Sequence, residues 1–153
     1  MLLQYHKLHE ETITPVRSNP SDVGLDIFFC PAPGKPKELE LRPQSSILLG
    51  TGLKFGVPHG YMLEVKNRSS VASKRQLLVG ACVIDPGYDG EVYVNLHNVG
   101  SRPRRVKAGD KIAQIVMVPV VHFRPVEIVD DALYDSDICI SNRGSGGFGS
   151  TGG

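Results

Sequence analysis

Residues 91–97, "EVYVNLH", decide the fold class because their side chains alternate in polarity. The apolar members Val92, Val94 and Leu96 stand at every second position, and a tyrosine, an asparagine and a histidine lie between or after them. Side chains of a β-strand point alternately to opposite faces, so this period of two is typical of a strand with one buried face. We therefore predict a half-buried strand here.

Similar short segments follow on both sides of this stretch. Residues 111–121, "KIAQIVMVPVV", are almost continuously apolar, which predicts a strand buried on both faces, with Pro119 restricting its ladder near the end. Residues 46–55 and 61–65 read as further strands, separated by the turn-forming "GVPHG" of residues 56–60. Many short strands at this spacing indicate a sandwich or barrel of jelly-roll type.

One segment has helical character. Residues 69–77, "SSVASKRQL", begin with serines that suit an N-cap, and they form the one predicted helix of useful length. The predicted fold class is thus all-β: a distorted jelly-roll β-barrel with at most one short helix and a flexible glycine-rich C-terminal arm. We assign residues 1–142 to the barrel domain and residues 143–153 to a lid of the same domain.

Length and charge restrict the possible functions. A chain of 153 residues suits one domain, and its formal net charge of +1 argues against broad electrostatic capture of nucleic acid or of an anionic membrane. No apolar run is long enough to span a bilayer, and the first residues lack the order of a signal peptide. The three cysteines, Cys30, Cys82 and Cys139, fit neither a disulfide framework nor a zinc cluster. We expect a soluble, intracellular protein of the cytoplasm or nucleus.

The tail, residues 143–153, reads "RGSGGFGSTGG" and has two interpretations. A glycine-rich end is often disordered. However, the glycines here surround one aromatic residue, Phe148, and follow one permanent cation, Arg143. Glycine backbone can approach a ligand closely and offer bare amides to anionic oxygens, so the tail could be a lid that orders over a flat ring and its phosphates.

Four other stretches indicate what such a lid would cover. They are "SDVGLDIFF" (residues 21–29), "NRSSVAS" (67–73), "GACVIDPGYDGEVYVNLHN" (80–98) and "GDKIAQIV" (109–116). Together with the tail, these five blocks, in this order and at these spacings, resemble the trimeric dUTPase family over about residues 21–152. The resemblance implies an all-β homotrimer that hydrolyses dUTP to dUMP and pyrophosphate with Mg²⁺, keeping uracil out of DNA and supplying dUMP for dTMP synthesis.

The resemblance also implies roles for the third block. Asp85 matches the catalytic aspartate that deprotonates the water attacking the α-phosphorus, although an aspartate before Pro-Gly is also an ordinary turn residue. Tyr88 matches the tyrosine that packs under deoxyribose and leaves no room for a 2′-hydroxyl. Residues 79–88 match the hairpin whose backbone reads uracil. The substrate-binding residues predicted here are Val79, Gly80, Cys82, Val83 and Ile84.

The remaining blocks would bind the triphosphate. Ser69, the amide of Ser70 and Gln114 match phosphate contacts, while Arg68 and Arg143 would oppose the phosphate charge. The tail residues assigned to the substrate are Gly147, Phe148, Gly149, Ser150 and Thr151, with Phe148 stacking on uracil. Asp26 matches the aspartate that supports the water shell of the magnesium ion, which the substrate phosphates chiefly hold.

In the family the site lies between subunits. One chain supplies the first, second and fourth blocks, a neighbour supplies the hairpin, and the third supplies the tail. This chain departs from the usual pattern in three blocks. In the second and third, Asn67 replaces a proline, and Ser70 and Cys82 replace glycines. In the first, Val23 and Leu25 replace a small residue and an aromatic one.

Two alternatives remain open. Deoxycytidine triphosphate deaminases have similar blocks, but they place a catalytic glutamate ten residues beyond the aspartate, where this chain has Asn95. The chain could also be a noncatalytic or regulatory trimeric scaffold. The argument against this alternative is that the chain has the residues expected of an active site, namely Asp85, Tyr88, Arg143 and Phe148.

Overall fold

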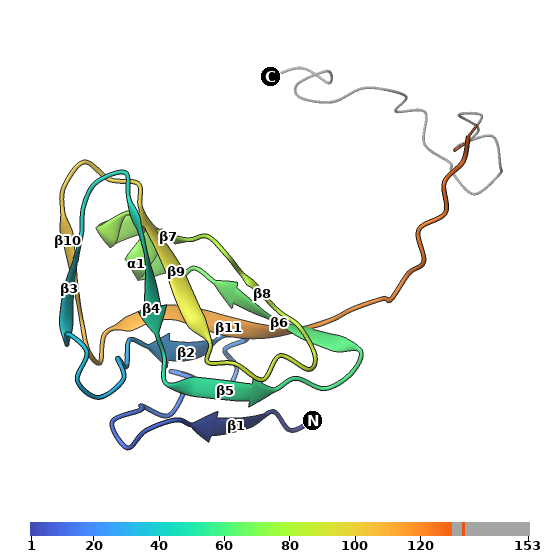
Figure 1. Cartoon of the computed structure of the whole chain (residues 1–153), viewed down its shortest axis with the longest axis horizontal. Coiled ribbons are helices and arrows are strands. Elements are labelled where there is room, and N and C mark those ends of the chain that lie inside the picture. Colours follow the sequence, from blue (N-terminus) through green and yellow to red (C-terminus); the bar gives the residue numbers. More distant parts are fainter. Residues whose placement is uncertain (130–132, 134–153) are drawn as a thin grey trace. The chain divides into compact units, whose positions relative to one another are not determined.

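The computed structural model describes residues 1–129 and 133, and its regular structure is almost entirely β. This part of the chain contains eleven strands and one short helix, which confirms the predicted class of a jelly-roll β-barrel (Figure 1). The strands and the helix all belong to a compact unit, Met1–Val121. Residues 122–129 of the second unit, His122–Gly153, have no helix or strand. Cys139 and the tail lie outside the described residues.

The strands form four antiparallel sheets. Two sheets are two-stranded, with orders β1-β5 and β10-β3, and the others have orders β2-β11-β6-β8 and β4-β9-β7. The elements are β1 (Gln4–Lys7), β2 (Leu25–Phe28), β3 (Glu38–Leu41), β4 (Ser46–Gly50), β5 (Leu53–Gly56), β6 (Tyr61–Lys66), α1 (Ser69–Arg75), β7 (Leu77–Val79), β8 (Val83–Ile84), β9 (Tyr93–Asn98), β10 (Arg104–Lys107) and β11 (Lys111–Pro119).

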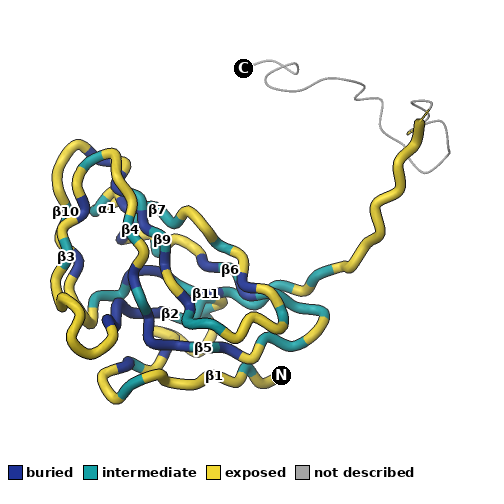
Figure 2. The backbone as a smooth tube through the Cα atoms, in the orientation of Figure 1, coloured by how far each residue is buried: buried dark blue, intermediate teal, exposed yellow. Residues whose placement is uncertain are grey.

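The alternation in residues 91–97 is confirmed. In and beside β9, Val92, Val94 and Leu96 are buried, whereas Tyr93 is half exposed. Strand β9 lies between β4 and β7, so its apolar face closes the core while its other face remains accessible (Figure 2).

The predicted two-sided burial of residues 111–121 holds for the first half of β11. Ile112 and Ala113 are adjacent and both fully buried, since β11 lies in the interior of the four-stranded sheet, between β2 and β6. The later residues of the strand are only partly buried, and the strand ends at the exposed Pro119, opposite Tyr61. Proline has no N–H to donate, which suits a strand end.

Residues 46–55 form two strands rather than the single strand that was predicted. Strand β4 pairs with β9, and β5 pairs with β1, so the chain changes sheets at Thr51 and Gly52. Gly52 has a φ of +67°, a backbone conformation that favours glycine, and the Thr51 hydroxyl donates to the carbonyl of Val92 at 2.7 Å. This corner is a tertiary feature that apolar periodicity does not reveal.

The predicted helix exists but is shorter than residues 69–77. It ends at Arg75 because Gln76 adopts the left-handed conformation, and Leu77 begins β7. The predicted serine N-cap is wrong: Arg68 occupies the cap position without a side-chain cap bond, and Ser69 and Ser70 are the first helical residues.

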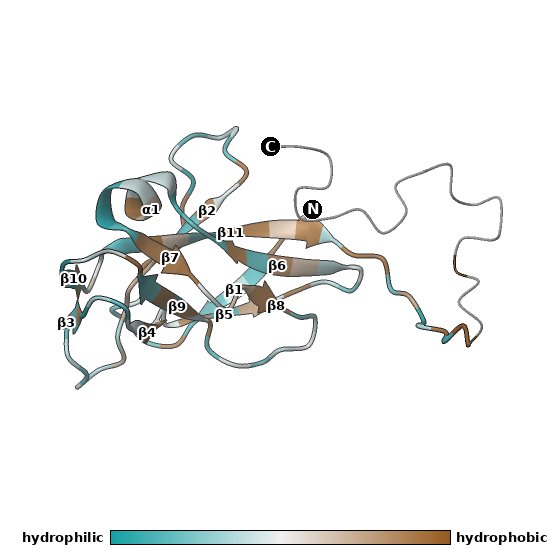
Figure 3. Cartoon of the chain, turned by 90° about the horizontal axis from the view of Figure 1, so that it is seen from above, coloured by the Kyte–Doolittle hydropathy of each residue, from teal (hydrophilic) through white to brown (hydrophobic). Residues whose placement is uncertain are grey.

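The core lies between the sheets. Figure 3 shows the apolar residues of β7, β8 and β11 in brown and the outer side of α1 in teal. The largest fully buried side chains include Phe29, Ile27, Leu49, Leu53, Leu63, Leu77, Leu96 and Ile112. Over residues 1–129 and 133, the helical structure falls short of the length and apolarity that crossing a membrane requires.

Candidate active site

The segment of residues 79–84 is held between β6 and β9. On one side, Val65 of β6 donates its N–H to the carbonyl of Cys82 at 2.7 Å, and Leu63 pairs with Ile84. On the other side, Gly80 donates its N–H to the carbonyl of Asn95 at 2.9 Å. Main-chain bonds on both sides therefore fix the wall that this segment presents.

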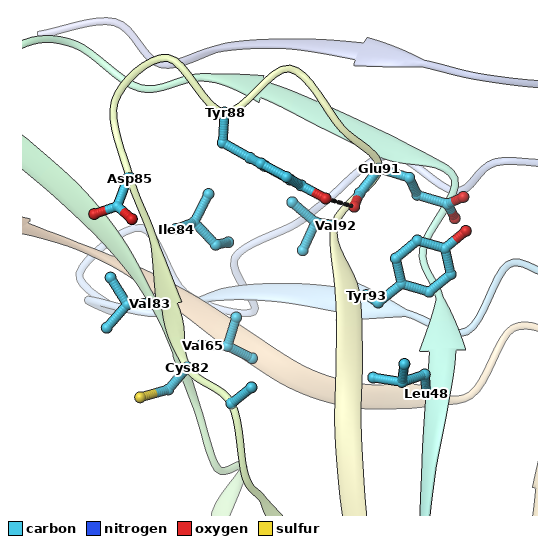
Figure 4. A pocket seen from close by; sticks show the side chains of 11 residues that line it. Leu48, Val65, Cys82, Val83, Ile84, Asp85, Tyr88, Glu91, Val92 and Tyr93 are labelled. Carbon is cyan, nitrogen blue, oxygen red and sulfur yellow. Dashed lines mark hydrogen bonds between the residues drawn. The ribbon is translucent and has the colours of Figure 1, made fainter.

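An apolar cavity of about 240 Å³ opens beside this segment (Figure 4). Figure 4 shows the side chains of Val83, Ile84 and Asp85 on one side of the cavity and those of Val92, Tyr93 and Leu48 on the other. The residues that line this cavity are Leu48, Val65, Ala81, Cys82, Val83, Ile84, Asp85, Tyr88, Glu91, Val92 and Tyr93. The cavity thus brings together five predicted site residues from the third block.

A tight turn fixes Asp85 relative to Tyr88. Gly87, with a φ of +86°, allows the chain to reverse, and the Tyr88 N–H donates to the Asp85 carbonyl at 3.3 Å. The Tyr88 hydroxyl donates to the carbonyl of Glu91 at 2.8 Å. Asp85 is exposed and Tyr88 is 48% exposed, so both side chains are accessible to a ligand.

Glu91 and Tyr93 form a polar edge of this cavity that the sequence did not identify. The Glu91 carboxylate accepts a hydrogen bond from the N–H of Gly52 at 2.8 Å. A hydrogen bond with Glu91 and the charge of that carboxylate raise the pKa of Tyr93. Glu91 therefore joins the end of the hairpin to the corner between β4 and β5.

A second cavity, of about 290 Å³, is polar and charged. It collects residues from the first, second and fourth blocks, which are far apart in the sequence. Its lining residues are Ser18, Asp22, Val23, Gly24, Asp26, Arg68, Ser69, Ser70 and Gln114.

Asp26 is the buried acid of the second cavity. Arg68 donates to it from Nε to Oδ1 at 2.6 Å, and Lys111 Nζ lies 2.8 Å from Oδ2. Burial alone would raise the pKa of Asp26, but the hydrogen bonds from Lys111 and Arg68 outweigh it and hold the pKa below its ordinary value. Asp26 is therefore a carboxylate that orients two cations.

Gln114 lines the second cavity beside Gly24. A Cβ added to Gly24 would lie 1.8 Å from the Gln114 Oε1, so the glycine makes room for this side chain. The Gln114 Nε2 donates to the main-chain carbonyl of Asn67 at 2.9 Å. The amide of Gln114 is thereby oriented by the residue that precedes Arg68.

The protein groups fit a magnesium ion only through water and substrate. Among residues 1–129 and 133, no group of three or more His, Cys, Asp or Glu side chains could hold a metal. Arg68 and Lys111 already engage both oxygens of Asp26. This set of donors is compatible with an ion that retains its waters and binds substrate phosphates.

The two cavities have no lining residue in common. Val79 and Gly80, also predicted to bind substrate, line neither cavity; they lie at the end of β7 and at the start of the following turn. The predicted tail residues Arg143, Gly147, Phe148, Gly149, Ser150 and Thr151 lie outside the described residues.

Several residues of the two cavities were missed by sequence reasoning. Ser18 and Asp22 line the second cavity, and Lys111 reaches Asp26 from β11. Lys111 and Asp22 stand inside the quoted blocks, each two residues from a glycine, so a charged side chain near a glycine was an available signal. Leu48 carried no such signal, because only the pairing of β4 with β9 brings it to the apolar cavity.

Comparison with known proteins identifies one family. A family model described as dUTPase matches residues 10–152. The deoxyuridine 5'-triphosphate nucleotidohydrolases of Clostridium novyi and a Picosynechococcus species are 33% and 37% identical to the chain, each over 99% of both chains. The structure of the Staphylococcus bacteriophage 80alpha dUTPase with dUPNHPP has 26% identity and a TM-score of 0.81, covering 99% of this chain and 98% of that one.

With this fold and these similarities, the chain falls in the class of all-β proteins that act on nucleoside triphosphates. Within that class it belongs to the dUTPase family.

Proposed function

We propose that this chain hydrolyses dUTP to dUMP and pyrophosphate. Family membership over nearly the whole chain supports this activity. The observation that carries the proposal is the pair of cavities: one is apolar with a carboxylate at its rim, and the other is polar with Arg68, Ser69 and Gln114. The apolar cavity suits the aromatic base of dUTP, and the polar cavity suits its charged triphosphate.

Asp85 is the proposed general base. Its carboxylate takes a proton from a water molecule, whose oxygen forms a bond to the α-phosphorus while the bond from that phosphorus to the bridging oxygen breaks. Pyrophosphate leaves with the electron pair, and no covalent enzyme intermediate forms. The exposure of Asp85 at the rim of the apolar cavity supports this role, because the base must reach a water beside the substrate.

Residues 79–88 are proposed to select the base and the sugar. The main-chain groups of Gly80 to Ile84 read the uracil edge, and cytosine fails because its exocyclic amine would leave buried backbone groups unpaired. The ring of Tyr88 packs against deoxyribose. The bond from its hydroxyl to the Glu91 carbonyl holds the ring in place, which supports a steric role against a 2′-hydroxyl.

The second cavity is proposed to bind the phosphates. Ser69, Ser70 and Gln114 supply neutral donors, and Arg68 supplies a cation that Asp26 orients. Arg143 and the other predicted tail residues complete the site as a lid, with Phe148 over the base. A magnesium ion would neutralise charge on the triphosphate; Asp26 would support its water shell. In a protein of similar structure, the dUTPase from phage phi11 of S. aureus, a structural Mg(II) ion has been described.

We further propose a homotrimer with shared active sites. The absence of any lining residue common to the two cavities supports this arrangement, since a site assembled from two copies would use the apolar cavity of one and the polar cavity of the other.

The proposed environment of the protein is reducing and intracellular. An odd number of widely spaced cysteines supports it, and Cys30 and Cys82 are free thiols.

A deaminase is the nearest rival, and Asn95 argues against it. Its Oδ1 lies 2.8 Å from His97 Nε2 and 3.4 Å from the N of Ala81, so its side chain is engaged in hydrogen bonds. An amide at this position lacks the carboxylate that a deaminase uses to transfer protons.

One experiment separates the candidates. The purified full chain is incubated with dUTP or dCTP and Mg²⁺, and pyrophosphate and ammonia are assayed in parallel. Pyrophosphate from dUTP without ammonia is expected. Ammonia from dCTP would identify a deaminase, and neither product would identify a noncatalytic scaffold.

A further inference from the structure

Asn67 connects the two cavity-lining segments of the chain. It lies between the end of β6 and Arg68, directly before the residues that line the polar cavity. Its side-chain Oδ1 accepts a hydrogen bond from the N–H of Val79 at 2.7 Å. Its main-chain carbonyl accepts the bond from Gln114 Nε2 at 2.9 Å. One residue thus contacts a phosphate-cavity side chain and the first residue of the base-reading hairpin.

The bond to Val79 compensates for a gap in the sheet. Strand β6 pairs with the hairpin segment at Leu63 with Ile84 and at Glu64 with Val83, and Val65 bonds to Cys82. The described pairing of β6 with this segment does not continue to Val79, whose register partner is Leu96 of β9 on the other side. The Asn67 side chain extends the contact by one more bond, at the end of the segment where the ladder has stopped.

The N–H of Val79 points away from its other neighbour. In β7, Leu78 pairs with His97, and Gly80 donates to the Asn95 carbonyl, so the residues on either side of Val79 face β9. The alternation along a strand turns the Val79 N–H to the opposite edge, where Asn67 Oδ1 is the acceptor. Without that oxygen the N–H has no protein partner in the described geometry, and this end of the segment is less constrained.

The resemblance of residues 67–73 to the second block of the family implies a proline where this chain has Asn67. A proline has no side-chain acceptor, so it could not make the bond to Val79.

We propose that Asn67 is a positioning residue for base selection, which acts by holding the Val79 end of the hairpin segment. The inference rests on the proposed dUTPase activity. Asn67 lines neither cavity, so its side chain acts through Val79 rather than on the substrate. Loss of its side chain weakens base recognition but leaves its main-chain bond to Gln114 in place, so phosphate binding is retained.

The test compares Asn67→Ala with Asn67→Asp in the full chain. Alanine removes the acceptor, while aspartate keeps an oxygen at the same place. In Asn67→Ala we expect the Val79 amide to exchange with D₂O about fivefold faster, since one hydrogen bond of typical net strength is lost. The amides of Gly80 and Val65 donate to main-chain carbonyls and serve as internal controls. Asn67→Asp is expected to restore slow exchange at Val79.

Kinetic measurements test the consequence for selection. In Asn67→Ala, KM for dUTP is expected to rise, and the ratio of kcat/KM for dUTP over dCTP to fall about fivefold, while kcat changes little. Inhibition by inorganic triphosphate, which probes the phosphate cavity alone, is expected to be unchanged. Lys66→Ala is the matched control, because the Lys66 ammonium pairs with Glu64 on the same strand and not with the hairpin.

Unchanged exchange at Val79 in Asn67→Ala would overturn the inference, as would an equal loss of triphosphate inhibition and dUTP binding. If Asn67→Ala does not fold, Asn67→Leu, which has nearly the same shape and no acceptor, takes its place in both measurements. Amide exchange requires no turnover. A wild-type chain that is inactive on dUTP would therefore contradict the proposed function and still leave the exchange result readable.

Discussion

Arg68 and Asp26 form the ion pair that orders the polar cavity, with 2.6 Å between Nε and Oδ1 and 3.3 Å between the second guanidinium nitrogen and Oδ2. Asp26 lies on β2, and Arg68 stands before α1, 42 residues further along the chain. The Asp26 residue is only 6% exposed. Because Lys111 also binds it, one buried acid fixes two cations from different elements.

Replacing Asp26 with Asn is expected to lower both stability and activity. The substitution leaves Arg68 and Lys111 without their counter-charge, and we expect the free energy of unfolding to fall by about 1–3 kcal/mol. The kcat/KM for dUTP is expected to fall about 10–100-fold, because Arg68 loses its orientation. Urea unfolding and a pyrophosphate assay measure the two effects. Glu11→Gln is the control, since its ion pair with Lys37 is exposed and screened by solvent. Equal losses in both variants would contradict the prediction.

The same ion pairs predict a pH dependence of stability. Folding holds the pKa of Asp26 below its ordinary value, so folding favours the charged carboxylate. The contribution is fully present at neutral pH and is lost as the pH falls below about 4 and through the folded-state pKa. The difference in unfolding free energy between the wild type and Asp26→Asn should therefore shrink toward low pH in urea titrations. A difference that stays constant from pH 7 to pH 3 would show that the charge of Asp26 is not responsible.

Replacing Asp85 with Asn is expected to reduce turnover and to leave the fold intact. The Asp85 side chain is exposed, so its loss costs little stability, while removal of a general base costs about 10²–10⁴-fold in rate. Pyrophosphate release and thermal unfolding are measured together. Asp89→Asn is the matched control, because Asp89 is an acid of the same loop whose partner is Lys54. Normal turnover in Asp85→Asn would remove this residue from the role of base.

Two variants of Tyr88 separate its ring from its hydroxyl. Tyr88→Ala removes the surface proposed to exclude a 2′-hydroxyl, so the preference for dUTP over UTP should fall by about tenfold or more. Tyr88→Phe keeps the ring and loses only the bond to the Glu91 carbonyl, so most of the preference should remain. The ratio of kcat/KM values for the two nucleotides is the measurement. Equal selectivity in the alanine variant and the wild type would locate sugar discrimination elsewhere.

Deleting residues 143–153 is expected to abolish efficient turnover without changing the melting temperature of the barrel. The compact unit Met1–Val121 does not include these residues. The point variants Phe148→Ala and Arg143→Ala divide the effect between the base and the phosphate ends. A truncated chain that turns over dUTP at the wild-type rate would rule out the lid.

Local patterns were sufficient for some of the fold and the candidate site. The alternation of Val92, Val94 and Leu96 predicted the strand β9 and its buried face, because side-chain direction along a strand depends only on the local backbone. The roles of Asp85 and Gln114 came instead from the resemblance of their blocks to a known family, which could be recognised because each block is continuous in the chain.

The sequence by itself therefore determined the all-β class, the family and the residue types available for chemistry. Only the tertiary structure decided that residues 46–55 turn a corner at Gly52, that Lys111 joins Arg68 at Asp26, and that Asn67 reaches Val79. These contacts join residues distant in sequence, and their geometry depends on how strands pair and change sheets. Strand pairing depends on how the whole core packs, which involves residues far apart in the sequence, so a local pattern does not determine it.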